Sequence, residues 1–389
     1  MKVSILGHGV VGKGVWEMLK NNSGYEIRNV LVKKGEKTAD FMTEEFEDVV
    51  NDDSELVIEC MGGIDPAYKF TSSCLEAGKS IISSNKALVA AHGIDLMNTA
   101  RRKGKAFIFS AACGGAIPIL QNLCLARRTD RIIWAGGILN GTTNYILDSM
   151  DRRGLGFDEA LAEAKALGYA EFDPTADISG MDTLRKIMLI SMVAFDVLPN
   201  SDYNIEGIQS VSALDFEVAD ELGCTIRLIG KCGLAGSGRL YAYVQPALCD
   251  RSSAYAGIRS NINLARYEGQ NSGVMSFMGQ GAGRYPTASA ILRDVTSVSD
   301  GQLQMLTEKC LVGFPYNDAK ECERHYFIRI DEASFGALKA AAPLRHVVCE
   351  KKGYVFAVTE PVTVKAMHDL AAELRRHGAK LFFAEKRED

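Results

Sequence analysis

The chain has 389 residues, of which 47% are hydrophobic and 24% charged, and its formal net charge at pH 7 is −5. This length exceeds what one hydrophobic core usually serves, so we expect two or three domains. The composition is that of a soluble globular protein. Because the charge balance is acidic, it provides no general attraction to nucleic acid or to an anionic membrane surface.

The ten cysteines are scattered without a C-x-x-C pair, and the six histidines show no metal-ligand spacing. We therefore expect reduced, mostly buried thiols in a cytoplasmic protein. The N-terminus leads straight into a predicted strand, which argues against a signal peptide. No apolar run approaches the roughly 18 residues of a membrane span.

The first predicted element is a short apolar strand, residues 2–6, followed by Gly7-His8-Gly9-Val10-Val11-Gly12 and an amphipathic helix. The glycines allow a tight turn and close approach of a pyrophosphate, whose charge the helix N-terminus favours. Because the motif stands between a strand and a helix, it predicts a dinucleotide-binding βαβ unit. The expected cofactor contacts here are Gly7, Gly9, Val10, Val11 and Gly12.

The second predicted strand, about residues 27–32, ends at Lys33 and Lys34. A site that prefers NAD usually offers an acidic side chain to the ribose hydroxyls at this point. Lysines suit the 2′-phosphate of NADP instead, so we expect NADP as the cofactor, contacted by Lys33, with NAD as the alternative. Solvent-facing lysines would explain the same residues.

Strands at residues 55–61 and 80–82 alternate with a helix and indicate a parallel, doubly wound sheet. Ligands bind beyond the carboxyl ends of such strands, where Gly62, Ser84 and Lys86 would lie. Lys86 could carry charge to substrate or cofactor, or could be a solvated loop lysine. After the strand at 105–109, a run of small residues at 112–120 indicates close approach of a ligand or ion, or tight packing.

From about Arg131 the pattern changes to alternating segments that indicate a mixed sheet. A loop rich in carboxylates, residues 168–177, leads into a helix on which Asp182 and Lys186 share one face. A lysine among carboxylates could sit beside an ammonium-bearing substrate and exchange a proton. The alternative is an ordinary exposed ion pair, which contributes roughly a few tenths of a kcal/mol to stability.

We expect an α/β protein in three parts. The first is a Rossmann-type doubly wound parallel sheet, residues 1–130, rejoined by a helix at 286–310. The second is an α+β substrate or catalytic domain with a mixed sheet, residues 131–285. The third is a small C-terminal βαββαβ module, residues 321–389, with a ferredoxin-like order of elements.

Several separated motifs together resemble the homoserine dehydrogenase family, and the resemblance covers roughly residues 1–310. Besides the glycine motif, the Asp173-Pro174 pair, Asp182 and Lys186, the matching stretches are Ser84-Asn85-Lys86-Ala87-Leu88, Gly114-Gly115-Ala116-Ile117-Pro118-Ile119, Gly137-Ile138-Leu139-Asn140-Gly141-Thr142-Thr143-Asn144-Tyr145, Gly168-Tyr169-Ala170-Glu171 and Gly281-Ala282-Gly283-Arg284-Tyr285-Pro286-Thr287-Ala288-Ser289.

The resemblance implies interconversion of L-homoserine and L-aspartate 4-semialdehyde with NAD(P), in threonine and methionine biosynthesis. It implies that Glu171 and Asp182 hold the amino-acid substrate, with Thr142 as a further contact. Lys186 would donate the proton to the aldehyde oxygen as hydride arrives. Lys86 would bridge cofactor and substrate and is a rival for the proton transfer.

The resemblance also implies that Gly168, Gly281 and Gly283 line the nicotinamide side. The implied partner is a small amino acid, and the implied assembly is a homodimer or homotetramer.

Two other functions stay open. One is a catalytically idle relative that binds nucleotide or amino acid as a regulator, and the other is a Rossmann dehydrogenase for a different amino-acid alcohol or aldehyde. The joint presence of Lys186, Asp182, Glu171 and Lys86 favours the enzyme.

Two features depart from the family pattern. The family usually has a glutamate where Ser110 stands, as a ligand to a monovalent cation that backbone carbonyls also bind. Cys113, Gly115 and Ile117 could still supply those carbonyls to Na⁺ or K⁺, but the carboxylate is missing. The tail fits an amino-acid-sensing ACT domain, yet residues 331–336 only loosely match its effector turn. A degenerate, structural or dimerising module is therefore the alternative to a threonine sensor.

Overall fold

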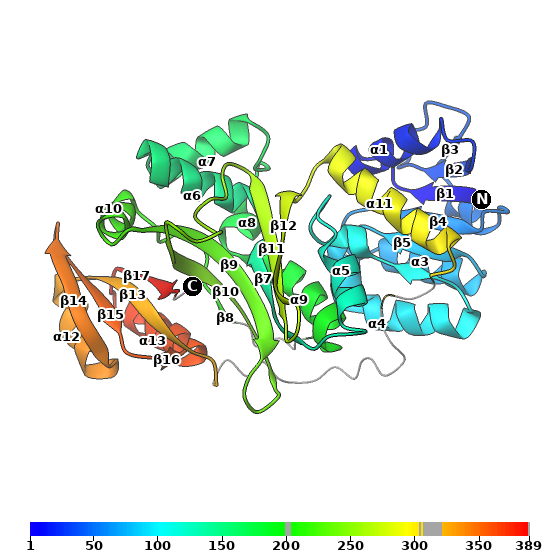
Figure 1. The fold of residues 1–389 in the computed structure, drawn as a ribbon. Coiled ribbons are helices and arrows are strands. Elements are labelled where there is room, and N and C mark those ends of the chain that lie inside the picture. The colour runs from blue at the N-terminus through cyan, green and yellow to red at the C-terminus, as the bar shows by residue number, and fades with distance from the viewer. Residues whose placement is uncertain (199–203, 303–304, 306–320, 388–389) are drawn as a thin grey trace. The chain divides into compact units, whose positions relative to one another are not determined.

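A computed structural model of the chain describes residues 1–198, 204–302, 305 and 321–387. The described residues form two compact units, each with its own sheet (Figure 1). The first unit comprises residues 1–131, 188–198, 279–302 and 305, and the second comprises 132–187, 204–278 and 321–387. Residues 303–304 and 306–310 of the helix expected at 286–310 lie outside the described residues.

The sheet of the first unit has six parallel strands in the order β3-β2-β1-β4-β5-β6. Its strands are β1 (Lys2–Leu6), β2 (Glu26–Leu31), β3 (Met42–Thr43), β4 (Leu56–Glu59), β5 (Ser80–Ser83) and β6 (Phe107–Ile108). This is the strand order of the dinucleotide-binding doubly wound fold. The expected Rossmann-type sheet is therefore confirmed.

Helices flank the six strands (Figure 1). They are α1 (Val10–Leu19), α2 (Phe46–Val50), α3 (Ala67–Glu76), α4 (Lys86–Lys103), the 3₁₀ turn η1 (Ser110–Ala112), α5 (Ile119–Ala126) and α11 (Arg284–Ser299). Helix α11, from far along the chain, packs against α1. Gly14 makes this contact close, because a Cβ there would lie 3.0 Å from Cγ of Arg284.

The second unit is built on a mixed sheet whose main path is β12-β11-β7-β9-β10-β17-β13-β15-β14. Its strands are β7 (Ile132–Ile138), β8 (Asn204–Ile205), β9 (Cys224–Leu234), β10 (Leu240–Asp250), β11 (Ile262–Gly269), β12 (Gly273–Gln280), β13 (Glu323–Asp331), β14 (Leu344–Lys351), β15 (Tyr354–Thr359), β16 (Val362–Thr363) and β17 (Leu381–Lys386). The expected mixed sheet is thus confirmed.

The helices of the second part of the chain are α6 (Gly141–Arg153), α7 (Phe157–Ala166), α8 (Thr175–Ile178), α9 (Met181–Phe195), α10 (Ala213–Glu221), α12 (Glu332–Ala341) and α13 (Val364–Arg376). Residues from 188 onward in α9 belong to the first unit. The carboxylate-rich loop expected at residues 168–177 ends in the short helix α8. The C-terminal elements follow the order βαββαβ, with the two-residue strand β16 added.

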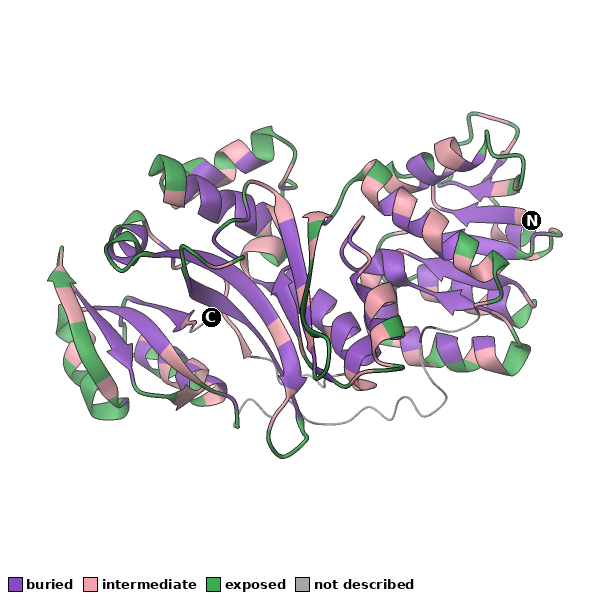
Figure 2. Ribbon diagram, in the orientation of Figure 1, coloured by how far each residue is buried: buried purple, intermediate pink, exposed green. Residues whose placement is uncertain are grey.

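The C-terminal strands continue the sheet of the second unit. Strand β17 pairs in parallel with β10, through Ala247 with Glu385 and Leu248 with Lys386. Most strands of both sheets are largely buried, except the edge strands β12 and β14, whereas many helices present exposed faces (Figure 2). The nine described cysteines are reduced thiols and most are buried, as expected, while Cys310 lies outside the described residues.

Candidate active site

The glycine motif forms the tight turn between β1 and α1. Gly7 has φ +97°, in the left-handed region that favours glycine. A Cβ on Gly12 would lie 2.0 Å from the Gly7 carbonyl oxygen, so no larger residue fits there. Gly9 is the N-cap of α1 and provides no side-chain cap. The first backbone N–H groups of α1 therefore lack side-chain partners and suit an anion.

A cavity of about 1120 Å³ lies at this turn, beyond the ends of β2 and β4. Four of the expected cofactor contacts line it, namely Gly7, Gly9, Lys33 and Gly62, together with Lys13 and Lys34. His8, which was not among the expected cofactor contacts, also lines it, and its ring centroid lies 6.1 Å from that of Trp16. Burial, and then the nearby positive charge of Lys13, lower the pKa of His8 from its usual value.

Ser84 and Lys86 lie at the carboxyl end of β5, where the chain turns into α4. Asn85 is the N-cap of α4, and its side chain accepts a hydrogen bond from the Leu88 N–H at 3.1 Å. Lys86 is the first residue of the helix and is half-buried. The same turn contacts Glu59, a fully buried carboxyl at the end of β4. The sequence did carry a signal for Glu59, because it is an acidic residue inside an apolar strand.

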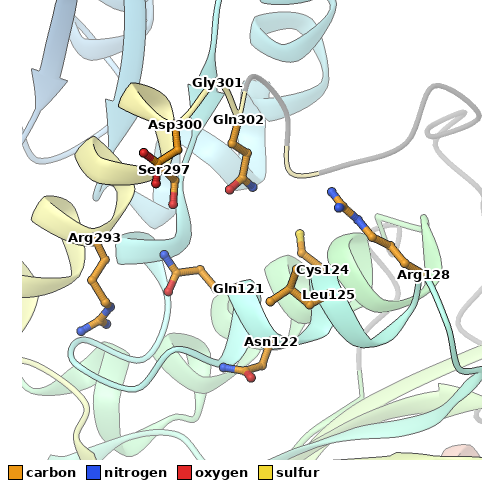
Figure 3. A pocket seen from close by; sticks show the side chains of 10 residues that line it. All are labelled: Gln121, Asn122, Cys124, Leu125, Arg128, Arg293, Ser297, Asp300, Gly301 and Gln302. Atoms are coloured by element: carbon orange, nitrogen blue, oxygen red, sulfur yellow. The ribbon is translucent and has the colours of Figure 1, made fainter.

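The loop from Ser110 to Ile117 is held by two neighbouring residues of α11. The Ser110 hydroxyl donates to the Asp294 carboxylate, and the Arg293 guanidinium donates to the Ala116 carbonyl at 2.8 Å. Burial raises the pKa of Asp294 to about 6. The Gln121 amide also donates to Asp294, at 2.9 Å. Gln121 and Arg293 line a cavity of about 700 Å³ between α5 and α11 (Figure 3).

The expected cation site at the carbonyls of Cys113, Gly115 and Ile117 stays a prediction. Ser110 supplies no carboxylate to it, and its hydroxyl donates to the Asp294 carboxylate, while Arg293 places a positive charge at the Ala116 carbonyl. No group of three or more His, Cys, Asp or Glu side chains suited to a metal occurs among the described residues. The loop instead packs tightly, since a Cβ on Gly115 would lie 2.6 Å from the Gly281 carbonyl carbon.

In the second unit, Lys186 and Asp182 form a buried ion pair on α9. The Lys186 Nζ lies 2.7 Å from Oδ2 of Asp182 and donates to the Leu139 carbonyl at 2.6 Å. Only 6% of Lys186 and 7% of Asp182 is exposed. The reading of this pair as an ordinary exposed ion pair is therefore wrong. Packing of α9 against β9 is close, because a Cβ on Gly230 would lie 2.7 Å from Ile187.

Two asparagines complete this cluster and were missed as site residues. The Asn140 amide donates to Asp182 at 2.8 Å and to Asp177 at 2.7 Å. The Asn263 amide donates to the Leu139 carbonyl, the acceptor that Lys186 also uses, at 2.8 Å. Asn140 lies in one of the stretches that resemble the family, but Asn263 lies outside every motif and has no sequence signal.

The remaining expected residues lie on the loop that precedes α9. Thr142 is buried and donates to the Tyr169 carbonyl at 2.5 Å, which ties α6 to this loop. Gly168 takes φ +73°, the left-handed conformation that ends the α7 segment. Glu171 is exposed. Among the described residues, the cluster around Lys186 thus includes Asp182 and Asp177 but not the Glu171 carboxylate.

Comparison with known proteins identifies the family. Residues 118–296 match the family model described as Homoserine dehydrogenase, and residues 7–110 match Homoserine dehydrogenase, NAD binding domain. The homoserine dehydrogenase of Corynebacterium glutamicum is 34% identical over 366 residues, which cover 88% of this chain and 82% of the relative. The chain belongs to the homoserine dehydrogenase family.

Other homoserine dehydrogenases agree in sequence and in fold. That of Mycobacterium tuberculosis is 37% identical over 313 residues, covering 75% of this chain and 71% of the relative. The crystal structure of a homoserine dehydrogenase from Thiobacillus denitrificans matches with a TM-score of 0.88 and 27% identity, covering 100% of this chain and 98% of that one. The Staphylococcus aureus enzyme at pH 7.5 matches with a TM-score of 0.79 and 28% identity, covering 100% and 99%.

These relationships confirm the expected enzyme class. The chain is a nicotinamide-dependent oxidoreductase that acts on the CH–OH group of homoserine, an activity of threonine and methionine biosynthesis. Neither an idle nucleotide-binding relative nor a dehydrogenase of another specificity finds support. Among the described helices, none is long and apolar enough to pass through a bilayer.

Proposed function

We propose that the chain interconverts L-homoserine and L-aspartate 4-semialdehyde with NADP, and that Lys186 carries the proton. The observation that carries this proposal is the buried Lys186 amine, held between the Asp182 carboxylate and the Leu139 carbonyl. Such an amine has a defined position and direction, as proton transfer requires.

The bound nicotinamide supplies or accepts the hydride at the substrate carbon. When the aldehyde is reduced, its oxygen develops negative charge and needs a proton or a cation nearby. The Lys186 ammonium would give that proton to the oxygen and recover it from solvent. In the direction of oxidation, the neutral amine would take the hydroxyl proton. Asp182 would hold Lys186 in place and contact the substrate hydroxyl.

The loop carboxylates suit the ammonium end of an amino acid. Glu171 is exposed and therefore accessible to a ligand, while Asp177 is half-buried and bound to the Asn140 amide. We assign the substrate ammonium to Glu171 and the orientation of the loop to Thr142 and Asn140. An exposed carboxylate can order on binding, at the cost of its side-chain freedom.

Lys86 is the rival for proton transfer. It begins α4 and lies beside Ser84, at the edge of the sheet where ligands of doubly wound folds bind. A lysine at that edge suits charge neutralisation of the cofactor or of the substrate carboxylate. Lys186 is preferred as the proton carrier because it is buried and bonded at two defined acceptors.

The preference for NADP is supported by the wall of the nucleotide cavity. Lys33 and Lys34 line it and are exposed to the solvent that a 2′-phosphate would replace. Glu44 lines the same cavity, but its carboxylate accepts from the backbone of Gly35 and Lys37 at 3.0 and 3.3 Å. That carboxylate holds the turn carrying the lysines and is less available to ribose hydroxyls.

The C-terminal module and the assembly belong to the same proposal. The antiparallel order β17-β13-β15-β14 supports a likeness to ACT domains, and either a structural or a threonine-sensing role is consistent with it. We further propose a homodimer or homotetramer in the cytoplasm. Light scattering of the purified protein measures the oligomeric state. The effect of threonine on turnover tests the threonine-sensing role of the C-terminal module.

The decisive experiment is reduction of NADP⁺ and of NAD⁺ by the purified chain with L-homoserine. We expect turnover with both nucleotides and a higher kcat/KM with NADP⁺. Absence of turnover with either nucleotide would overturn the proposed reaction. Equal or better use of NAD⁺ would overturn the cofactor preference alone. L-serine and L-threonine are the matched alcohol controls, and neither is expected to support turnover.

A further inference from the structure

Glu59 is a buried carboxyl that no motif singled out and that the proposed mechanism does not use. It ends β4 and has no exposed surface. Its three donors are neutral: the Met61 N–H at 2.7 Å, the Ser83 hydroxyl and, at 3.5 Å, the Asn85 amide. Burial raises the pKa of Glu59 to about 7. A carboxyl placed here therefore costs folding stability whenever it is ionised.

The donors to Glu59 belong to two turns at the carboxyl edge of the sheet. Met61 begins the turn that contains Gly62 and Gly63, after β4. Ser83 and Asn85 belong to the turn that contains Ser84 and leads into Lys86, after β5. Neighbouring parallel strands bring these turns together, since Glu59 on β4 lies opposite Ser83 on β5.

Further hydrogen bonds join the two turns into one network. The Asn85 amide donates to the Gly63 carbonyl at 2.6 Å, and the Asn85 N–H donates to the Ser83 hydroxyl at 3.1 Å. The Ser84 N–H donates to the Glu59 carbonyl at 3.1 Å. Asn85 also caps α4, so the direction of the first helical turn, which begins with Lys86, depends on this network.

We propose that Glu59 is a positioning residue for the nicotinamide cofactor, because its carboxyl holds the Gly62–Gly63 turn and the Ser84–Lys86 turn in one arrangement. The inference rests on the proposed roles of Gly62, Ser84 and Lys86 in cofactor binding. The carboxyl contacts both turns at once, since Oε1 accepts from the Met61 N–H and the Asn85 amide, and Oε2 accepts from the Ser83 hydroxyl. Ser83 is the relay, because its hydroxyl donates to Glu59 and accepts from Asn85.

Three variants separate the functions of this carboxyl. Glu59→Leu removes both acceptors at nearly constant volume. Glu59→Gln keeps one acceptor for Met61 and offers an amide to Ser83, so it preserves most of the network. Ser83→Ala leaves the carboxyl but removes the relay to Asn85. Ile58→Val, on the same buried strand, is the control, because it removes core volume without touching either turn.

The direct readout is the dissociation constant of NADPH, from the fluorescence of the bound nucleotide. Because one or two hydrogen bonds at the turns are lost, the dissociation constant of NADPH should rise roughly 10-fold for Glu59→Leu and about 3-fold for Ser83→Ala. Glu59→Gln should stay within about 2-fold of wild type, and Ile58→Val should bind normally although it melts at a lower temperature. If Glu59 only filled space, Glu59→Leu and Glu59→Gln should bind NADPH equally well. Weaker binding by the leucine variant alone therefore indicates that the hydrogen bonds of Glu59 are needed.

A second measurement tests the route through Lys86. If Glu59 acts by placing this lysine, Glu59→Leu should weaken binding less in a Lys86→Ala background than in wild type. Full additivity, or wild-type NADPH affinity in folded Glu59→Leu, would overturn the proposal. Should Glu59→Leu not fold, Ser83→Ala carries the test, and unchanged affinity there would overturn it equally.

Failure of the proposed reaction is distinguishable from failure of this inference. Nucleotide binding is measured without substrate, whereas the reaction is judged by wild-type turnover of L-homoserine. A wild-type chain that binds NADPH but does not oxidise L-homoserine would leave the roles of Glu59 and Ser83 measurable.

Discussion

The Nζ of Lys186 lies 2.7 Å from Oδ2 of Asp182, one helical turn earlier on α9, and both side chains are almost fully buried. An exposed pair with this spacing contributes little to stability. A buried pair is different, because removing one partner leaves the other charge without compensation. The amine and the carboxylate therefore depend on each other for position and for charge.

Replacing Lys186 with alanine should abolish turnover while cofactor affinity stays nearly unchanged. A positioned general acid contributes roughly 10²–10⁴-fold to a rate, so we expect kcat to fall by at least about 100-fold. The measurement is turnover of L-homoserine alongside NADPH binding. Lys339→Ala, at an exposed helical lysine on α12, is the control. Near-normal activity of Lys186→Ala would exclude proton transfer by Lys186 and would favour Lys86 as the proton carrier.

The Asp182–Lys186 pair should show strong coupling in stability. Asp182→Asn and Lys186→Met should each cost up to about 3 kcal/mol of unfolding free energy, since each removes the ion-pair partner of a buried charge. The double variant should cost at least about 1 kcal/mol less than the sum. Urea unfolding of the four proteins measures this. Simple additivity would show that the two charges do not stabilise one another.

Asn140 should tolerate serine better than aspartate. Its side-chain oxygen caps α6 by accepting from the Thr143 N–H at 2.8 Å, and its amide donates to Asp177 and Asp182. Asn140→Asp keeps the cap but brings a third carboxylate beside two others, which should destabilise the protein by about 2–4 kcal/mol near pH 8. Asn140→Ser should cost about 1 kcal/mol.

The pH dependence of the Asn140 variants distinguishes repulsion from lost packing. Part of the stability of Asn140→Asp should return as pH falls, because protonation of a carboxylate relieves the repulsion. Asn140→Ser should show no such recovery relative to wild type. Unfolding free energies at about pH 8 and pH 5 provide the comparison, and parallel curves for the two variants would contradict the electrostatic explanation.

Lys33 and Lys34 should set the cofactor preference. A charge-assisted hydrogen bond to the 2′-phosphate is worth about 1.5–3 kcal/mol, so Lys33→Ala with Lys34→Ala should raise KM for NADP⁺ by roughly 10-fold or more. KM for NAD⁺ should change little. Lys37→Ala is the control, since Lys37 lies in the same exposed turn but outside the cavity lining. An equal effect on both nucleotides would reject a 2′-phosphate contact.

His368 should make the protein less stable in mild acid. It lies on α13 with its Nε2 3.0 Å from the Gln245 side-chain oxygen, and burial lowers its pKa to about 4. Because the folded pKa is depressed, the unfolded chain binds the proton more tightly between about pH 6.5 and 4. This residue alone should therefore remove about 2 kcal/mol of stability between pH 7 and pH 5.

The matched variants isolate that contribution from other titrating groups. His368→Gln should lose less stability than wild type over the same fall in pH, whereas His346→Gln, at an exposed histidine on β14, should follow wild type. Urea unfolding at each pH is the measurement. Identical slopes for wild type and His368→Gln would show that His368 does not resist protonation in the folded state.

Much of the first unit could be predicted from sequence because its signals are local. Gly12 needs to be glycine for a steric reason local to the turn, because a Cβ there would meet the Gly7 carbonyl oxygen. The strand before the turn, β1, is a short and mostly buried apolar run. The spacing of Asp182 and Lys186 likewise places them on one face of a helix without knowledge of the rest. Burial of that pair could not be predicted, because it depends on which surfaces pack over α9.

Other site contacts join residues far apart in the chain. Asn140 bonds Asp182 across 42 residues of sequence and Ser110 bonds Asp294 across 184. Asn263 bonds the Leu139 carbonyl, which Lys186 also uses, across 124 residues. The loss of the family glutamate at Ser110 was visible in the sequence. That the hydroxyl would instead bond a buried carboxylate of α11 was not.

The sequence by itself determined the βα alternation, the nucleotide-binding turn, the placing of Asp182 and Lys186 on one helix face, and the family resemblance, since periodicity and turn chemistry act over a few residues. Only the tertiary structure decided that Glu59 joins two turns, that β17 continues the sheet beside β10, and that Lys186 is buried. Burial and long-range hydrogen bonding depend on how distant segments pack, and a local pattern does not encode that packing.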